Sequence, residues 1–367
     1  MLRVNPTAPR TGDAPNVLFA GLSKTPLCWY RCALPARALG ADWAGIGGDP
    51  SALEFHTGHA GRPLRSIEDF ATYDVVVLQQ MRGKAWVRAI RDLQAAGVTV
   101  LYEIDDYLHG ISKAKGHLFA SHFDGALLAE HEASMRACDG IICSTRYIAT
   151  RYIATRYRAF NANVWVCENG LDLGRYALTR REHETVTIGW SGGTGHRPAL
   201  TPWLRELAAI MEARPNTRFM TVGDWGYVAP FIERFGPERA IELGWTKSIE
   251  VYPAAMANFD LALAPATNSA FYRGKSDLRW LESSALGIPV IADPVVYPSI
   301  EHGVTGLHAT TPAAAREAML ALIDDAALRA RLGSAAHEYV REHRTSAAVA
   351  PQWTQAFEQA RALSRAA

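Results

Sequence analysis

Short apolar runs alternate with longer amphipathic ones along this chain, and polar or glycine-containing turns separate them. Apolar runs of about four to seven residues are typical of strands buried in a parallel sheet, and runs with helical periodicity are typical of the helices that cover such a sheet. The alternation therefore predicts a succession of β-strand–α-helix units.

The predicted elements fall into two series with a polar gap between them. In the first series we expect strands at 16–21, 74–79, 98–104, 139–144 and 163–167, and helices at 28–39, 84–96, 117–137 and 145–158, while 41–70 is ambiguous. In the second we expect strands at 186–190, 218–222, 240–243, 260–264 and 289–292, helices at 199–213, 227–235, 248–258 and 275–286, and terminal helices from 312 onward.

This organisation predicts an α/β protein with two Rossmann-like, doubly wound parallel-sheet domains that face each other across a cleft. A length of 367 residues suits two domains better than one. We expect a flexible tail at 1–15, an N-terminal domain at 16–167, a linker at 168–184, a C-terminal domain at 185–345, and a helix at 346–367 that packs back on the N-terminal domain.

Composition narrows the class of protein. Hydrophobic residues make up 49% of the chain and charged residues 20%, which is typical of an ordered protein with large cores. No apolar run approaches the ~20 residues of a membrane span, and the tail lacks a signal-peptide core. The 5 cysteines form no Cys-x-x-Cys pair, so we expect reduced, buried thiols in a cytoplasmic protein and no metal bound through them.

Glycine-rich turns follow the first strand of each series. The second is the more specific: Gly-Gly-Thr-Gly at 192–195 stands between a strand and a helix, where backbone N–H groups can surround a phosphate, and Arg197 adds a cationic donor. The first turn fits a plain tight turn equally well; its candidate residues are Gly21, Ser23, Lys24 and, on the following helix, Arg31. Neither turn fits a nucleoside-triphosphate loop or a dinucleotide fingerprint.

The segment 271–292 combines a polar loop, an amphipathic helix, a glycine stop and a short apolar strand. Lys275 and Ser276 stand where we expect the helix to begin, which favours phosphate binding because a helix N-terminus offers unpaired N–H groups. Glu282, about two turns further on, is placed to accept hydrogen bonds from sugar hydroxyls. A surface helix with mixed charges is the alternative interpretation.

This segment resembles the donor-binding segment of GT-B glycosyltransferases of the family-four type (glycosyl transferases group 1), in which Lys-Ser-Asp-x-(Lys/Arg)-x-x-Glu-x-x-Ala-x-Gly-x-Pro-Val recurs. Both glycine turns, the linker at 167–176, and the segments at 242–246 and 258–265 are similar to parts of that family as well. The resemblance implies a nucleotide-diphosphate-sugar donor held by Gly192, Gly193, Thr194, Trp245, Arg273, Ser276, Asp277 and Glu282, with Lys275 and Arg197 as the catalytic cations.

One position departs from the family pattern. Glu282 matches the second glutamate of the family's Glu-x7-Glu motif, whereas Gly274 stands where the first is often found. Contacts to the transferred sugar are therefore in doubt, and we expect Arg273, Lys275 or Asp277 to take them over.

The segment after the predicted strand 98–104 carries candidate acceptor-side groups. Asp105 and Asp106 are adjacent carboxylates that could orient an acceptor hydroxyl or act as base, and helix capping explains them equally well. Tyr107 and His109 follow them. In related enzymes an Asp-Asp or a His at the end of this strand lines the acceptor side. The irregular histidine spacing gives no zinc pattern, and we expect no metal site.

These features predict a glycosyltransferase that moves a sugar from a UDP-, GDP- or ADP-sugar to a hydroxyl of a saccharide, lipid, protein or modified DNA base. The resemblance implies retention of configuration and no required cofactor. One alternative is a viral-type enzyme that glycosylates hydroxymethylated pyrimidines, motivated by basic residues and the Arg-Tyr repeat at 146–157, although the net charge of +1 argues against it. The repeat also fits a tandem duplication in a surface helix. The other alternative is a non-catalytic nucleotide-sugar-binding homologue.

Overall fold

The computed structural model describes residues 15–22, 25–46, 64, 66–111, 120–154, 161–179, 184–223, 226, 228–246 and 249–366. The chain forms two compact units. Unit 1 contains Met1–His109, His122–Leu171 and Ser346–Ala367, and unit 2 contains Gly110–Ser121 and Asp172–Thr345.

Unit 1 is built on a parallel sheet of 6 strands in the order β2-β1-β3-β4-β5-β6. The strands are β1 (Val17–Leu22), β2 (Asp42–Ile46), β3 (Val75–Gln79), β4 (Thr99–Ile104), β5 (Gly140–Cys143) and β6 (Val164–Val166). Its α-helices are α1 (Pro26–Cys28), α2 (Leu34–Leu39), α3 (Lys84–Ala95), α5 (Gly125–Ala137), α6 (Arg146–Ala154) and α14 (Ser346–Ala366), together with the start of α4 (Leu108–Ile111), whose last two residues are counted in unit 2. Strand β2 lies in the segment whose pattern was ambiguous.

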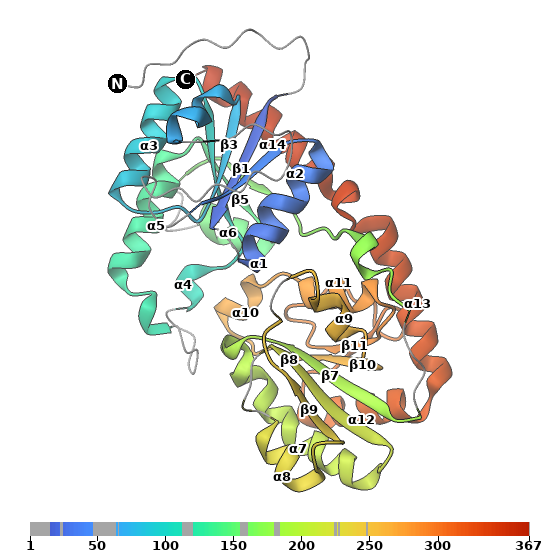
Figure 1. Cartoon of the computed structure of the whole chain (residues 1–367). Coiled ribbons are helices and arrows are strands. Elements are labelled where there is room, and N and C mark those ends of the chain that lie inside the picture. The colour runs from blue at the N-terminus through green and yellow to red at the C-terminus, as the bar shows by residue number, and fades with distance from the viewer. Residues whose placement is uncertain are drawn as a thin grey trace. The chain divides into compact units, whose positions relative to one another are not determined.

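Alternate residues of the strands in unit 1 face two different helical layers. Phe19 on β1 points to α14, where its ring contacts the rings of Trp353 at 5.2 Å and Phe357 at 5.9 Å between centroids. In Figure 1, α2 and α14 cover one face of this sheet, and α3 and α5 cover the other. The last helix of the chain is thus part of the core of unit 1.

Unit 2 holds a second parallel sheet of 6 strands in the order β12-β11-β10-β7-β8-β9. The strands are β7 (Val186–Gly192), β8 (Thr217–Gly223), β9 (Ala240–Leu243), β10 (Leu261–Ala264), β11 (Val290–Ala292) and β12 (Leu307–His308). The α-helices are α7 (Arg197–Ala213), α8 (Ala229–Phe235), α9 (Tyr252–Met256), α10 (Ala270–Gly274), α11 (Leu278–Ala285), α12 (Pro312–Asp324) and α13 (Ala326–His343).

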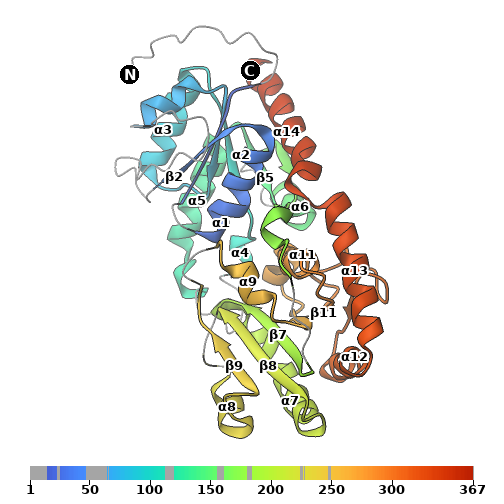
Figure 2. The ribbon, with the colours of Figure 1, turned by 45° about the vertical axis from the view of Figure 1, so that its right-hand side comes forward.

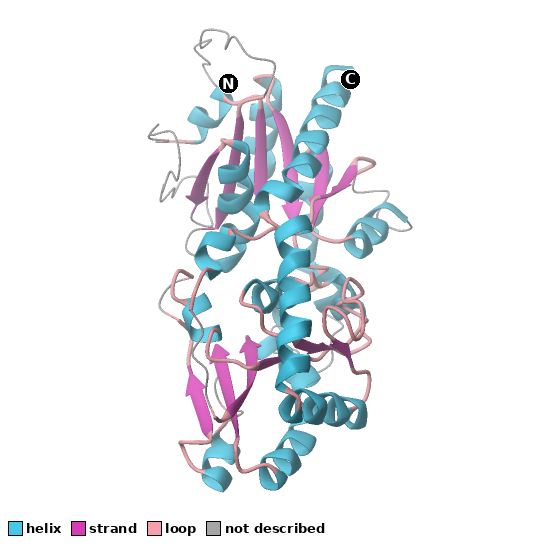
Figure 3. Cartoon of the chain, turned by 90° about the vertical axis from the view of Figure 1, so that its right-hand side faces the viewer, coloured by secondary structure: helices cyan, strands magenta, loops and turns pink. Residues whose placement is uncertain are grey.

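The main core of unit 2 lies between its sheet and the helices α7, α8 and α12 (Figure 2). Ile188 and Trp190 on β7 face this core together with Leu207 of α7 and Met319 of α12, and all four side chains are fully buried. Helix α11 contacts β10 and β11 and packs on α13. Figure 3 shows that helices flank the strands in each unit. The predicted α/β fold with two parallel-sheet domains is confirmed.

The local structure corrects four predicted helices. The expected helix 117–137 begins only at Gly125, where Asp124 is the N-cap. The expected helix 275–286 begins only at Leu278, because Lys275 has an extended backbone (φ −66°, ψ 144°) that ends the short helix α10. The expected helix 248–258 is reduced to α9. The expected helix 28–39 contains a π-helical stretch, Trp29–Ala33.

The composition led us to expect buried thiols and no membrane-spanning segment. All five cysteines are buried, and none forms a disulfide. Among the helices that the structure describes, none combines the length and the apolar character that crossing a membrane requires.

Candidate active site

The order of strands in unit 2 creates a topological switch point between β7 and β10. These two strands are neighbours, with Ile188 opposite Leu261, yet the chain leaves β7 toward β8 on one side and β10 toward β11 on the other. Loops that follow such a pair of strands diverge and leave room for a ligand at the carboxyl ends of the strands. The loop after β7 contains the glycine turn, and the segment after β10 leads to Lys275.

Close backbone packing shapes the glycine turn. Gly223, at the end of β8, has φ +108°, and a Cβ there would lie 2.6 Å from the carbonyl oxygen of Gly192. A Cβ on Gly192 would itself lie 2.9 Å from an Nη2 atom of Arg279, and one on Gly193 would lie 3.3 Å from the ring of Trp245. The absence of side chains therefore lets Arg279 and Trp245 approach the turn from two sides.

Tyr272 joins the segment after β10 to the glycine turn. Its hydroxyl donates to the carbonyl oxygen of Gly195 at 3.4 Å, and its ring packs against the ring of His196 at 5.8 Å between centroids. The backbone N–H of Lys275 donates to the carbonyl oxygen of Tyr272 at 3.0 Å, and its ammonium group lies 4.7 Å from the ring centroid of Phe271. Lys275 is thus held on the segment that contacts the turn.

Glu282 is a buried carboxylate on α11. The hydroxyl of Tyr252 donates to Oε2 of Glu282 at 3.4 Å, and Glu282 is only 4% exposed. Burial is the main cause, and the charge of Glu282 the second, of a Tyr252 pKa well above its usual value. The Tyr252 hydroxyl therefore stays protonated and can donate. A carboxylate accepts several hydrogen bonds, which makes a residue of this type suitable for a hydroxyl donor such as that of a sugar.

Arg279 is a further candidate site residue, which the sequence did not single out. Its guanidinium lies 5.8 Å from the ring centroid of Trp190, and its Nη2 atom is buried with no hydrogen-bond partner among the described residues. A buried guanidinium N–H without an acceptor is costly, and an anion beside Gly192 would remove that cost. Arg279 occupies the Lys/Arg position of the motif Lys-Ser-Asp-x-(Lys/Arg), and this was the sequence signal for it.

The remaining predicted donor-side residues differ in how they are used. Arg197 begins α7, and its Nη2 atom would lie 3.0 Å from a Cβ at Gly226. Arg273 is exposed and donates to the side chain of Asn268 at 2.8 Å. Trp245 is 63% exposed. Ser276 is half-buried between α10 and α11, and Asp277 is buried in an ion pair with Arg344. Thr194 lies in the turn, but its side chain is outside the described part.

In unit 1, the predicted residues after β1 lie in the interior. A Cβ on Gly21 would lie 2.7 Å from the side-chain oxygen of Gln79, so this turn also requires glycine. Arg31 is 1% exposed and donates from Nε to Glu103 at 2.7 Å and from Nη1 to Asn169 at 2.9 Å. Burial raises the pKa of Glu103, and the charge of Arg31 opposes that shift. Ser23 and Lys24 lie outside the described residues.

The acceptor-side candidates lie after β4. Gln80, the one non-glycine residue with positive φ in the described ranges (+52°), donates to Asp105 at 2.7 Å. Such backbone strain is common at functional sites. Asp106 is half-buried. The buried His109 lies 3.0 Å from Glu132 of α5 through Nε2.

Neighbouring aromatic and basic groups complete this cluster. The ring of Tyr107 is 6.0 Å from that of His109 and 6.1 Å from that of Tyr147, measured between centroids. Arg136 donates to the second oxygen of Glu132 at 3.3 Å. The structure therefore brings Tyr107 and His109 together, with Glu132 holding the imidazole.

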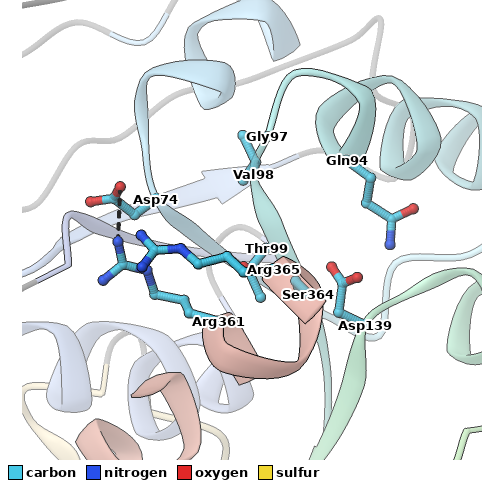
Figure 4. Close-up of a pocket in the computed structure, with 9 residues that line it drawn as sticks. All are labelled: Asp74, Gln94, Gly97, Val98, Thr99, Asp139, Arg361, Ser364 and Arg365. Atoms are coloured by element: carbon cyan, nitrogen blue, oxygen red, sulfur yellow. Dashed lines mark hydrogen bonds and ion pairs between the residues drawn. The ribbon is translucent and has the colours of Figure 1, made fainter. Parts of the chain in front are cut away.

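A cavity of about 270 Å³ in unit 1, drawn in Figure 4, is lined by other residues than these. Residues at the N-terminal ends of β3 and β4 and at the C-terminal end of α14 line this cavity. Its polar groups pair with the protein itself: Arg361 with Asp74 at 3.4 Å, and Asp139 with the N–H of Val100 at 2.7 Å. Because ligands of such sheets bind at the opposite, carboxyl edge, we assign this cavity no function.

Part of the chain matches a known protein family. Residues 185–325, which contain the glycine turn and α11, match the family model described as Glycosyl transferases group 1. Residues 185–325 thus form a group 1 glycosyltransferase domain. No curated protein sequence matches the chain.

Solved structures with low sequence identity share the fold of this glycosyltransferase over nearly its whole length. HepE from Anabaena, solved with UDP and glucose, is 18% identical, with a TM-score of 0.61 over 93% of this chain and 98% of its own. Sucrose-phosphate synthase from Thermosynechococcus elongatus is 15% identical, with a TM-score of 0.66 over 94% and 98%. A glycosyltransferase from Rickettsia africae is 13% identical, with a TM-score of 0.60 over 95% and 99%. The predicted GT-B fold is thereby confirmed.

Proposed function

We propose that this glycosyltransferase takes a sugar from a nucleotide-diphosphate-sugar donor bound at the switch point of unit 2. One observation carries the proposal: the unpartnered Nη2 atom of Arg279 lies against Gly192, at the carboxyl end of β7. A glycine turn and a cation at this edge of a doubly wound sheet suit a diphosphate. The UDP and glucose bound to HepE, which shares the fold, support a donor of this class.

In this proposal each part of the donor has its own group of residues. The diphosphate contacts Gly192, Gly193 and the cations Arg197, Lys275 and Arg279. Glu282 accepts hydrogen bonds from the ribose, because its buried carboxylate is already oriented by Tyr252. The ring of Trp245, exposed beside Gly193, offers a flat surface for the base.

The chemistry follows from where charge develops. When the bond between the anomeric carbon and the diphosphate oxygen breaks, negative charge grows on the leaving diphosphate. Lys275, Arg197 and Arg279 would stabilise that charge in place, so we propose that the reaction needs no divalent metal. Retention of anomeric configuration is part of the proposal through the likeness to family-four enzymes.

The acceptor hydroxyl is assigned to the cluster after β4 in unit 1. Asp105, fixed by Gln80, and His109, fixed by Glu132, are the groups that could orient it or take its proton. A saccharide or lipid-linked acceptor is our proposal. The repeat at 146–157 that motivated a DNA acceptor lies in α6 up to residue 154 and otherwise outside the described residues, so no observed contact favours that alternative.

Thermal unfolding of the purified chain with UDP-, GDP- and ADP-sugars tests the donor assignment. A ligand that binds only the folded state at about 100 times its dissociation constant stabilises it by about 2.7 kcal/mol, which raises the unfolding midpoint. We expect one nucleotide to raise the midpoint, and its sugar derivative to be hydrolysed slowly without acceptor. No shift with any of them would remove the donor assignment, whereas a shift without release of nucleotide would indicate a binding protein.

A further inference from the structure

The carboxylate of Asp277 does not cap helix α11, although its position at the start of the helix predicts that it would. Asp277 is the N-cap residue of α11, and aspartate at this position usually accepts a hydrogen bond from the first turn of the helix. Asp124 and Asp325 do so at the start of α5 and α13, each accepting at 2.8 Å. The side chain of Asp277 makes no such bond.

Arg344 holds this carboxylate instead. Its Nη1 atom donates to Oδ2 of Asp277 at 2.7 Å and its Nη2 atom to Oδ1 at 2.9 Å, so both carboxylate oxygens are engaged in a parallel pair. The two side chains are 6% and 9% exposed. Arg344 follows α13, 67 positions later in the chain, so no local rule of helix structure creates this pair.

The pairing changes the electrostatics at the start of α11. The first N–H groups of a helix have no partner within it, and its N-terminal end is positive. At the start of α11 the N–H of Trp280, the i+3 donor that a capping carboxylate usually binds, already donates to the backbone carbonyl oxygen of Asp277 at 2.9 Å. A free Asp277 carboxylate would therefore act at this helix end through its charge, which repels a phosphate. With the charge of Asp277 balanced by Arg344, the end of the helix beside Lys275 and Arg279 keeps its positive potential.

We propose that Arg344 is a positioning residue of the donor site, which withholds the Asp277 carboxylate from the end of α11 so that a diphosphate can occupy it. This inference rests on the proposed function, because it assumes a diphosphate at the switch point. It assigns Arg344 no contact with the donor itself.

Binding of UDP and of uridine, measured by calorimetry with GDP and ADP in parallel, tests the role of Arg344. Arg344→Gln frees the Asp277 carboxylate, and we expect UDP to bind about tenfold more weakly, the scale of charge effects at a helix end, with uridine affinity unchanged. Adding Asp277→Ala to Arg344→Gln removes the freed charge. UDP affinity should then return to near the wild-type value, even though the ion pair is still missing.

Two further variants separate positioning from stability. Leu322→Ala, which removes a buried side chain of α12, should lower the unfolding midpoint without changing the UDP affinity. Arg344→Lys keeps the charge but not the parallel pair, and should keep part of the affinity. Arg344→Lys also tests the positioning role if Arg344→Gln does not fold.

Each outcome bears on one of the two ideas. If Arg344→Gln binds UDP as the wild type does, or if Asp277→Ala restores no affinity to it, the positioning role is overturned and the proposed function stands. If the wild-type chain binds none of UDP, GDP and ADP, the proposed function fails, and the positioning role fails with it.

Discussion

The guanidinium of Arg31 donates to the carboxylate of Glu103 at 2.7 Å in the interior of unit 1, where the two side chains are 1% and 0% exposed. Asn169 accepts a second hydrogen bond from the guanidinium, and Trp353 of α14 lies 5.0 Å from its carbon Cζ. One residue of the π-helical stretch thus connects β4, the linker and the last helix.

Breaking this pair from one side is expected to destabilise unit 1. Arg31→Met leaves the Glu103 carboxylate buried without its cation, a change that costs about 3–5 kcal/mol in comparable pairs. Urea unfolding measures it. Arg31→Met combined with Glu103→Leu should lose less, and Arg361→Ala, which removes an ion pair on the surface of the same unit, should change stability by about 1 kcal/mol or less. Equal losses for both arginines would contradict this account.

Loss of Lys275 or Arg279 should impair turnover far more than stability. Because both cations are assigned to the leaving diphosphate, Lys275→Ala and Arg279→Gln should each reduce kcat by about 10²–10³-fold. Steady-state release of nucleotide from the donor measures this. Arg316→Gln, on the surface of α12, is the matched control and should have near wild-type kinetics. Wild-type turnover in Lys275→Ala would exclude the assignment.

Trp245 should contribute to binding of the base and little to folding. Its side chain is 63% exposed, so Trp245→Ala removes no core packing, while stacking on a base is worth about 1–3 kcal/mol. We expect about 5- to 100-fold weaker nucleotide binding with an unchanged unfolding midpoint. Val251→Ala, which truncates another exposed apolar side chain of unit 2, should leave the affinity unaltered. Similar affinities for Trp245→Ala and the wild type would rule out stacking.

Gly223→Ala should disturb the glycine turn, because Gly223 packs against the backbone of Gly192. The new Cβ would lie 2.6 Å from the carbonyl oxygen of Gly192, at a backbone φ of +108° that alanine rarely adopts. We expect a loss of about 2 kcal/mol or more in stability and weaker nucleotide binding. Gly244→Ala meets no atom within 4 Å and is the control for stability. A Gly223→Ala protein as stable as Gly244→Ala would contradict the packing argument.

His131 should make unit 1 sensitive to acid. Burial, followed by the charges of Arg82 and His109, lowers the pKa of His131 to about 3, and Tyr102 lies 2.6 Å from its Nδ1 atom. The unfolded chain takes up this proton below about pH 6.5 and the folded chain does not, so stability falls as pH falls from about 6.5 towards 3.

This linkage amounts to about 2 kcal/mol at pH 5, which urea unfolding at pH 7 and pH 5 can resolve. His131→Gln, which does not titrate, should lose that much less stability than the wild type between the two pH values. The same pH dependence in both proteins would show that His131 is not the responsible group.

The sequence pattern predicted strands better than the details of helices. Five of the strands in unit 1 were predicted within two residues at each end, because buried parallel strands are unbroken apolar runs. The pattern did not resolve β2 within the ambiguous range 41–70, since glycines and a proline interrupt the strand signal there. The start of α11 was misplaced because Lys-Ser-Asp has no intrinsic signal that separates an extended Lys275 from a first helical turn.

The sequence by itself determined the two α/β series, the glycine turn and the Lys275–Glu282 segment, because these depend on local periodicity and on residues close together in the chain. Only the tertiary structure decided which charges remain available. Asp277 is neutralised by Arg344 and Arg31 by Glu103, whereas Arg279 is left facing Gly192. Partners separated by 67 and 72 positions meet only when helices and strands pack, and no periodicity in the chain records that meeting.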